Sequence, residues 1–264
     1  MKKFLTAVAT ACLVISLGSG VALAASHEVP AEMPDIVPVE TWTCKFNDGK
    51  TMGDLNTVIA EWNEWLDDEA VTDYFAAVVT PNYFGEQLFD VGWLGAWADG
   101  NAMGAGTNLW VTEGGDMAAK FFEVLTCGSH SNFASLNIKP PSDDDDEGDD
   151  SFVLDFTNCS VKEGKTFDDV MAGMNAWAEY QAENGFQNST WMMFPIYGES
   201  NNDYDFKVVE GHDDHIGFGA DYELMGNGGH WRKNSEIFES LIDCDVARVY
   251  DAMTVREMQS DDDE

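Results

Sequence analysis

A carboxylate and an imidazole lie two residues apart on one predicted strand, at Glu210 and His212. Side chains alternate between the two faces of a strand, so both should point the same way as the apolar residues Phe206 and Val208. A carboxylate beside an imidazole raises the pKa of the imidazole and orients its ring, which suits acid–base chemistry. The sequence therefore gives Glu210, His212 and His215 as candidate catalytic residues.

Two other interpretations apply to the same segment. Glu210, His212, Asp214 and His215 together offer nitrogen and oxygen atoms of the kind that a divalent metal accepts. Alternatively, the strand ends near Gly211 and these polar groups face water. All three interpretations stay open at this point, and the site that we expect contains no metal and no other cofactor.

Aromatic residues at helical and strand spacing form a second candidate set. Residues of this kind usually belong to a hydrophobic core. They could also line a ligand pocket between a sheet and its helices, and Trp97, at the end of a predicted strand, is best placed to form a pocket wall. The candidate pocket residues are Trp62, Trp93, Trp97, Trp177, Tyr83 and Tyr197.

The chain contains an internal duplication. Residues 44–54 match residues 159–169 without a gap, at an offset of 115 positions, and the same offset carries Trp62 onto Trp177. Later positions match in the same order, with a slip of one residue around the prolines of the two halves. This many glycines, cysteines and tryptophans do not align in order by chance, so each half should form the same set of elements.

Each half contains the same series of predicted elements. In the first half, strands are expected at 41–46, 74–80, 89–97 and 132–138, with a helix from Thr51 and a helical region at 101–127 that breaks at Gly114-Gly115. Thr51 with Asp54, and Thr166 with Asp169, have the spacing of helix N-terminal caps. Pro81 and Pro195 are expected to stop strands. The order is β-α-β-β-α-β, twice.

That order is the ferredoxin-like unit. Its tandem occurrence resembles the dimeric α+β barrel superfamily, whose members include cofactor-free monooxygenases, haem enzymes and small-molecule lyases. The resemblance implies an α+β fold in which two tandem ferredoxin-like repeats, at 40–140 and 152–255, pair their antiparallel sheets into a pseudo-dimeric barrel. It also implies that ligands would sit between the sheet and the helices.

Four cysteines lie beyond the N-terminal segment, at Cys44, Cys127, Cys159 and Cys244, without a Cys-x-x-Cys pair. In a secreted protein they should be oxidised. Cys44 ends the first predicted strand and Cys127 ends the second helical region, two ends that lie at the same edge of such a unit. We therefore expect Cys44–Cys127 and Cys159–Cys244, each closing a loop of about 85 residues and stabilising the fold by about 4 kcal/mol.

Charge and the chain ends indicate the compartment. The 264 residues include 49 acids and only 13 Lys and Arg, a net charge of −36 that repels phosphate backbones and excludes nucleic-acid binding. Residues 1–24 have the layout of a secretory signal peptide cut after Ala24, which places the mature protein in the periplasm or outside the cell, free of the membrane. Residues 25–39 are expected to form an extended leader, 141–151 an acidic linker and 256–264 an acidic tail.

These observations predict a secreted or periplasmic protein that binds a small molecule. The carboxylate–imidazole pair would allow cofactor-independent turnover of an apolar or aromatic compound. One alternative is a non-catalytic structural or interaction protein, whose duplication serves only to close a barrel. A second alternative is a haem or metal-binding barrel protein, with His212 or His230 as the ligand. The sequence leaves open whether the ligand is turned over, and it does not give the oligomeric state.

Overall fold

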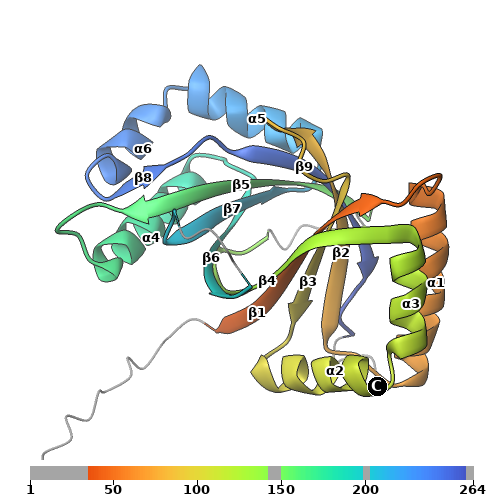
Figure 1. Ribbon diagram of the computed structural model, residues 1–264. Helices are drawn as coiled ribbons and strands as arrows, with labels where there is room; N and C mark the ends of the chain where they lie inside the picture. The colour runs from red at the N-terminus through yellow and green to blue at the C-terminus, as the bar shows by residue number, and fades with distance from the viewer. Residues whose placement is uncertain (1–34, 142–149, 199–202, 260–264) are drawn as a thin grey trace, which may run out of the picture. The chain divides into compact units, whose positions relative to one another are not determined.

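The computed structural model describes residues 35–141, 150–198 and 203–259 (Figure 1). The predicted signal peptide, most of the leader and most of the acidic linker lie outside these residues, as do positions 260–264 of the tail. The first half contains β1 (Ile36–Phe46), α1 (Met52–Asp68), β2 (Tyr74–Tyr83), β3 (Val91–Trp97), α2 (Gly100–Thr112), α3 (Gly115–Val124) and β4 (Leu125–Lys139). The second contains β5 (Ser151–Val161), α4 (Phe167–Glu183), β6 (Ser189–Tyr197), β7 (Phe206–His212), α5 (His215–Gly226), α6 (Trp231–Phe238), β8 (Ile242–Cys244) and β9 (Arg248–Arg256).

Eight antiparallel strands close into a barrel. Neighbouring strands follow the order β7-β6-β4-β1-β3-β2-β9-β5, and the pairing of β5 with β7 completes the ring. The short strand β8 adds to the end of β5. β4 of the first half pairs with β6 of the second, and β9 of the second pairs with β2 of the first, so each half completes the other's sheet. The predicted α+β class and the barrel are confirmed.

Both long helices begin where their caps predicted. The backbone N–H of Thr51 donates to the Asp54 carboxylate over 2.9 Å, and Thr166 repeats this contact with Asp169 over 2.8 Å. The Thr166 hydroxyl in turn accepts from the backbone N–H of Asp169. Each reciprocal pair satisfies groups that the first helical turn leaves without partners. The caps therefore fix where α1 and α4 start.

The prediction that Pro81 and Pro195 stop strands is wrong, because β2 and β6 continue through them. β3 pairs with β2 only as far as Val79, so the segment around Pro81 has a strand on one side alone, beside β9. β7 likewise pairs with β6 only up to Met193, before Pro195. Proline lacks an N–H, and a strand tolerates it where one edge has no ladder partner.

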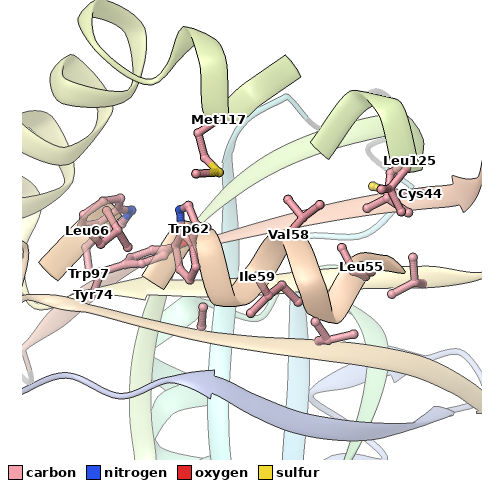
Figure 2. Close-up of a cluster of buried hydrophobic side chains, with 14 residues drawn as sticks. Cys44, Leu55, Val58, Ile59, Trp62, Leu66, Tyr74, Trp97, Met117 and Leu125 are labelled. Carbon is pink, nitrogen blue, oxygen red and sulfur yellow. The ribbon is translucent and has the colours of Figure 1, made fainter. Parts of the chain in front are cut away.

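Three apolar clusters divide the interior. One fills the barrel and consists of Val39, Val79, Phe133, Leu154, Met193, Val209 and Ala252, with partly buried neighbours. A second lies between the first-half strands and α1 and α3, and Figure 2 shows Leu55, Ile59 and Trp62 of α1 projecting into it. The third lies between the second-half strands and α4. Because side chains fill the barrel, space for a ligand must be sought between the sheet and the helices.

Two element boundaries differ from those expected. β1 begins at Ile36, inside the predicted leader, because this segment pairs with β4 as far as Leu136. Cys127 and Cys244 lie in strands rather than at a helix end, directly opposite Cys44 and Cys159. The expected pairs Cys44–Cys127 and Cys159–Cys244 are joined as disulfides across neighbouring strands.

A cation from the last strand of each half reaches into the other half. Lys139 of β4 donates to the backbone carbonyls of Phe186 and Asn188. Arg256 of β9 donates to the carbonyl of Val71 and contacts Asp67 over 3.1 Å. Val71 and Phe186 are equivalent in the duplication, so these contacts are related by its symmetry. In the described part of the chain, every helix is too short or too polar to cross a bilayer.

Candidate functional site

A cavity of about 500 Å³ lies between the second-half strands and helices α4, α5 and α6. Its floor is the outer face of β5, β6 and β7, where Asp155, Thr190 and Glu210 project. Its walls are mixed: Trp177 and Met174 of α4 and Phe238 of α6 give it an apolar part, while Asn234, Glu239 and Asp243 are polar. The cavity therefore combines a polar floor with apolar side chains on part of its walls, a composition that suits a small molecule.

Strand register brings two carboxyl groups together on that floor. Asp155 of β5 pairs directly with Glu210 of β7, and Glu210 pairs on its other side with Thr190 of β6. Burial, followed by the neighbouring charge of Glu210, raises the pKa of Asp155 to about 8. Burial also raises the pKa of Glu210. At neutral pH the Asp155 carboxyl therefore holds a proton and can donate it.

His212 completes the cluster behind the carboxyl pair. Its Nε2 lies 3.9 Å from Asp155 Oδ2, and its Nδ1 lies 3.4 Å from Asp221 Oδ2. Among the residues that the structure describes, Nδ1 is buried without an aligned hydrogen-bond partner. The interpretation that the strand ends near Gly211 with its polar groups in water is wrong, because β7 continues to His212, which is only 5% exposed.

Amide groups hold the carboxylates in place. Asn188 Nδ2 donates to Glu210 Oε1 over 3.1 Å, and Gln181 Nε2 lies 3.5 Å from the same oxygen. The backbone N–H groups of Gln187 and Asn188 donate to Asp221. Burial works to raise the pKa of Asp221, but the His212 imidazole and these N–H groups lower it overall. Asp221 is therefore the ionised member of the cluster, and Asp155 is the protonated one.

Asp155, Glu210 and His212 also have the spacing of a metal site, since one ligand atom from each lies within 4.8 Å of the others. A cation would need both carboxyl groups ionised, whereas burial favours their neutral forms. A proton and a cation are thus alternatives at the same oxygen atoms. Of the four metal ligands that the sequence suggested, the structure brings together only Glu210 and His212.

His215 and Asp214 lie elsewhere. His215 Nε2 contacts Asp251 Oδ1 of β9 over 2.7 Å, and its side chain is 53% exposed. Asp214 caps α5, accepting from the backbone N–H groups of Ile216 and Gly217. His215 does not line the second-half cavity.

The predicted pocket aromatics separate into three groups. Trp62, Trp93 and Trp97 line a second cavity, of about 190 Å³, between the first-half strands and their helices. Figure 2 shows Trp62, Tyr74 and Trp97 close together at one end of α1. Trp177 lines the second-half cavity. Tyr83 and Tyr197 line neither cavity and are 61% and 67% exposed.

Four residues of the second-half cluster were missed by sequence reasoning: Asp155, Gln181, Asn188 and Asp221. The duplication offered a signal for Asp155, because the offset of 115 aligns it with Glu40, a second carboxyl on an otherwise mixed strand. Asp221 gave no signal, since an acidic residue on a surface helix usually faces water. Its role depends on α5 folding back over the loop before β6.

The second-half cavity does not fit a haem. Its lining contains neither histidine nor tyrosine, and both of its cysteines are joined in a disulfide. Two methionines line it, but a methionine ligates haem iron together with a histidine, which this lining lacks. Four carboxyl residues line it with a single lysine, Lys162, which already pairs with Asp243 over 3.0 Å. Such a lining would repel the two propionates of a haem. His230, the other suggested haem ligand, instead forms a hydrogen bond of 2.7 Å between its Nδ1 and the Tyr180 hydroxyl.

The sequence matches no protein-family model and resembles no curated protein. Among solved structures, a candidate chlorite dismutase superposes with a TM-score of 0.51 at 12% identity, over 84% of this chain and 95% of its own length. An anthrone oxidase-like protein superposes with a TM-score of 0.49 at 11% identity, over 86% of this chain and 96% of its own length. A candidate monooxygenase from Lactobacillus acidophilus superposes with a TM-score of 0.48 at 12% identity, over 85% of this chain and 95% of its own length. The last two scores are too low to bear on the fold, and the first bears on the fold alone.

Proposed function

We propose that this chain, which has the dimeric α+β barrel fold, binds a small organic molecule in the second-half cavity and acts on it by proton transfer. The observation that carries the proposal is the pair of carboxyl groups, Asp155 and Glu210, which face each other across two neighbouring strands on the floor of the second-half cavity. Burying two carboxyl groups side by side, so that one of them keeps its proton at neutral pH, costs stability. A chain that keeps such a pair at the floor of a cavity is well explained by a chemical use for it.

The two groups have different roles in this proposal. Asp155, with its raised pKa, is the acid and donates its proton to a substrate oxygen. Glu210, which receives hydrogen bonds from amide groups, is the base and removes a proton from the substrate. This step converts the carbonyl compound into its enol and leaves the proton on Glu210. In the return step the enol gives its hydroxyl proton back to Asp155, and Glu210 gives its proton to carbon, so both groups regain their starting states and the net reaction is a proton exchange or an isomerisation that needs no oxidant. A carbonyl compound that passes through an enol fits this chemistry.

The apolar side chains in the walls of the cavity suggest what the body of the substrate is like. Trp177, Met174 and Phe238 present an aromatic ring, a thioether and a second ring to the cavity. An apolar or aromatic molecule with one carbonyl group would bury its body against them. Its oxygen would then lie at the floor, within reach of Asp155.

The test is a screen of aromatic and aliphatic ketones, read by fluorescence of the tryptophans and by thermal shift. Ligands found in this way are then incubated in D₂O and followed by NMR for exchange of the carbon-bound proton. We expect exchange with the wild type, loss of exchange in Glu210→Gln and Asp155→Asn, and retention in Glu40→Gln, the first-half counterpart. Binding without exchange would leave a binding protein and refute the enzyme. Bound stoichiometric metal in the purified protein, or no ligand from the screen, would refute the proton-transfer site.

We also infer that the two halves are ferredoxin-like repeats. Their strand orders support this inference, because β4-β1-β3-β2 and β9-β5-β7-β6 place equivalent strands in the same sequence. A secreted or periplasmic location is inferred from the predicted signal peptide and supported by the two disulfides. N-terminal sequencing of the mature protein should begin at Ala25, and a chain that retains Met1 would contradict the inference.

A further inference from the structure

The first-half cavity is aromatic to a degree that the fold does not require. Six of the nine tryptophans in the chain line it: Trp42, Trp62, Trp65, Trp93, Trp97 and Trp110. In the duplicated half, Trp42 is matched by Thr157 and Trp93 by Val208, and both replacements line the second-half cavity. The same layer of strands and helices therefore forms without these rings. Their number in the first half calls for a reason other than packing.

The rings meet in two ways: the Trp42 ring stacks on His130 with its centroid 3.6 Å away, and the Trp97 ring centroid lies 4.1 Å from that of Tyr74, whereas other pairs pack edge to face. Trp62 meets Trp93 at an interplanar angle of 84°, and Trp65 meets Trp110 at 69°. Rings packed edge to face leave part of a π-face uncovered, whereas stacked rings cover each other. A π-face is negative at its centre and attracts cations. Helix α2, which contributes no fully buried residue, covers the cavity with Gly106, Leu109 and Trp110.

One carboxylate lies among these rings. Glu40 of β1 lines the cavity, and its side chain keeps 19% of its surface exposed. The Tyr74 hydroxyl donates to Oε1 over 2.6 Å, and His130 Nε2 lies 2.7 Å from Oε2. Burial works to raise the pKa of Glu40, but the bonds from His130 and Tyr74 lower it overall. Glu40 is thus ionised at neutral pH, unlike its counterpart Asp155.

The difference between the two halves has a steric cause. A Cβ atom on Gly95 would lie 2.0 Å from the Tyr74 hydroxyl, so the Tyr74 ring occupies the space that Glu210 takes in the second half. In the second half the residue just before β6 is Asn188, which is smaller than tyrosine and donates to Glu210 instead of filling its space. The first half therefore has one ionised carboxylate and aromatic walls, and the second has a carboxyl pair.

We infer that the first half contains a second ligand site, separate from the proposed proton-transfer site, in which Glu40 and the surrounding tryptophans bind a small organic ammonium ion. A neutral apolar ligand would remove water from the exposed part of the Glu40 side chain without bringing a countercharge to the carboxylate. An anion would be repelled by Glu40 and by the net charge of −36. A compact alkylammonium pairs with the carboxylate and meets the ring faces, the arrangement used to recognise quaternary ammonium groups. A cavity of about 190 Å³ has room for such a headgroup.

The test compares choline with 3,3-dimethylbutan-1-ol, its uncharged carbon isostere, by calorimetry and tryptophan fluorescence at constant ionic strength. We expect saturable binding of choline, at least about ten-fold tighter than that of the alcohol, because a desolvated cation–π contact is worth this much. Glu40→Gln should weaken choline binding by about ten-fold or more, while Asp155→Asn, the matched change in the second half, should leave it unchanged.

Equal affinity for choline and the alcohol, or no saturable binding of choline, would overturn the inference. So would a loss of choline binding in Asp155→Asn with none in Glu40→Gln. If Glu40→Gln does not fold, Trp42→Leu provides the second variant, because Trp42 is only partly buried. It should also weaken choline binding, and an unchanged affinity there would count against the site.

Discussion

Replacement of Asp155 by asparagine should change how stability depends on pH. The pKa of this carboxyl is raised from 3.8 to about 8, mainly by burial. Below about pH 4 both the folded and the unfolded chain hold the proton. Between about pH 4 and pH 8 only the folded chain holds it, so each rise in pH favours unfolding. Above pH 8 the Asp155 carboxyl is ionised in both the folded and the unfolded chain, so it no longer makes stability depend on pH. An asparagine side chain cannot titrate, so the variant should lack this loss of stability.

The size of the effect follows from the same pKa values. One pH unit of difference corresponds to about 1.4 kcal/mol, so the difference at Asp155 could reach about 6 kcal/mol over its full range. Between pH 5 and pH 8, the free energy of unfolding of Asp155→Asn should rise relative to wild type by about 2–4 kcal/mol. Any constant effect of the substitution cancels in this comparison, as does the general repulsion among the other acids.

Urea unfolding with intact disulfides, measured at pH 5, 6, 7 and 8, gives these free energies. Asp99→Asn is the control. Backbone and side-chain bonds at the start of α2 lower the pKa of Asp99, so it is ionised in both states throughout this range and the variant should run parallel to wild type. Parallel curves for wild type and Asp155→Asn would mean that Asp155 ionises normally, and the assignment of Asp155 as the acid would be wrong.

Three further predictions concern the packing around Gly95, the two disulfides and the cations that connect the halves. Gly95→Ala should lower the free energy of unfolding by about 1–3 kcal/mol, because the added Cβ would overlap the Tyr74 side chain. Gly128→Ala is the control, since a Cβ there meets open space and should have little effect. Equal losses of stability in the two variants would refute the steric argument. Non-reduced peptide maps should show two linked pairs and no free thiol, and reduction should lower the melting temperature markedly, because loops of 83 and 85 residues are released. Lys139→Met and Arg256→Met should each lower stability by about 1–3 kcal/mol through the carbonyl groups left without donors, and unchanged urea midpoints would show that these cations do not tie the halves together.

Local features of the fold could be predicted from the sequence. The caps at Thr51 and Thr166 and the break at Gly114-Gly115 depend on residues within a few positions of one another, and the structure agrees with each. The duplication gave the repeated element order and, with it, the cysteine partners. Alternation placed Glu210 on the cavity face of β7, since a strand fixes the direction of every second residue.

Strand ends were harder to predict, because they depend on partners elsewhere in the chain. Pro81 stays within β2 because β3 has already diverged at that point and only β9 continues beside it. Ile36 joins β1 because β4 is long enough to pair with it. His215 follows β7 closely in sequence, but the turn into α5 directs it to Asp251.

Only the tertiary structure decided which residues share a site. Asp155 and Glu210 lie on strands separated in sequence by α4 and β6, and they meet through a register that no local pattern specifies. Glu40 and Asp155 occupy equivalent positions, yet one pKa is lowered and the other raised. Tyr74 and His130 bond to Glu40, whereas a second carboxyl faces Asp155. The sequence determined that both halves carry an acid at this position, and the surroundings assembled by folding determined which acid keeps its proton.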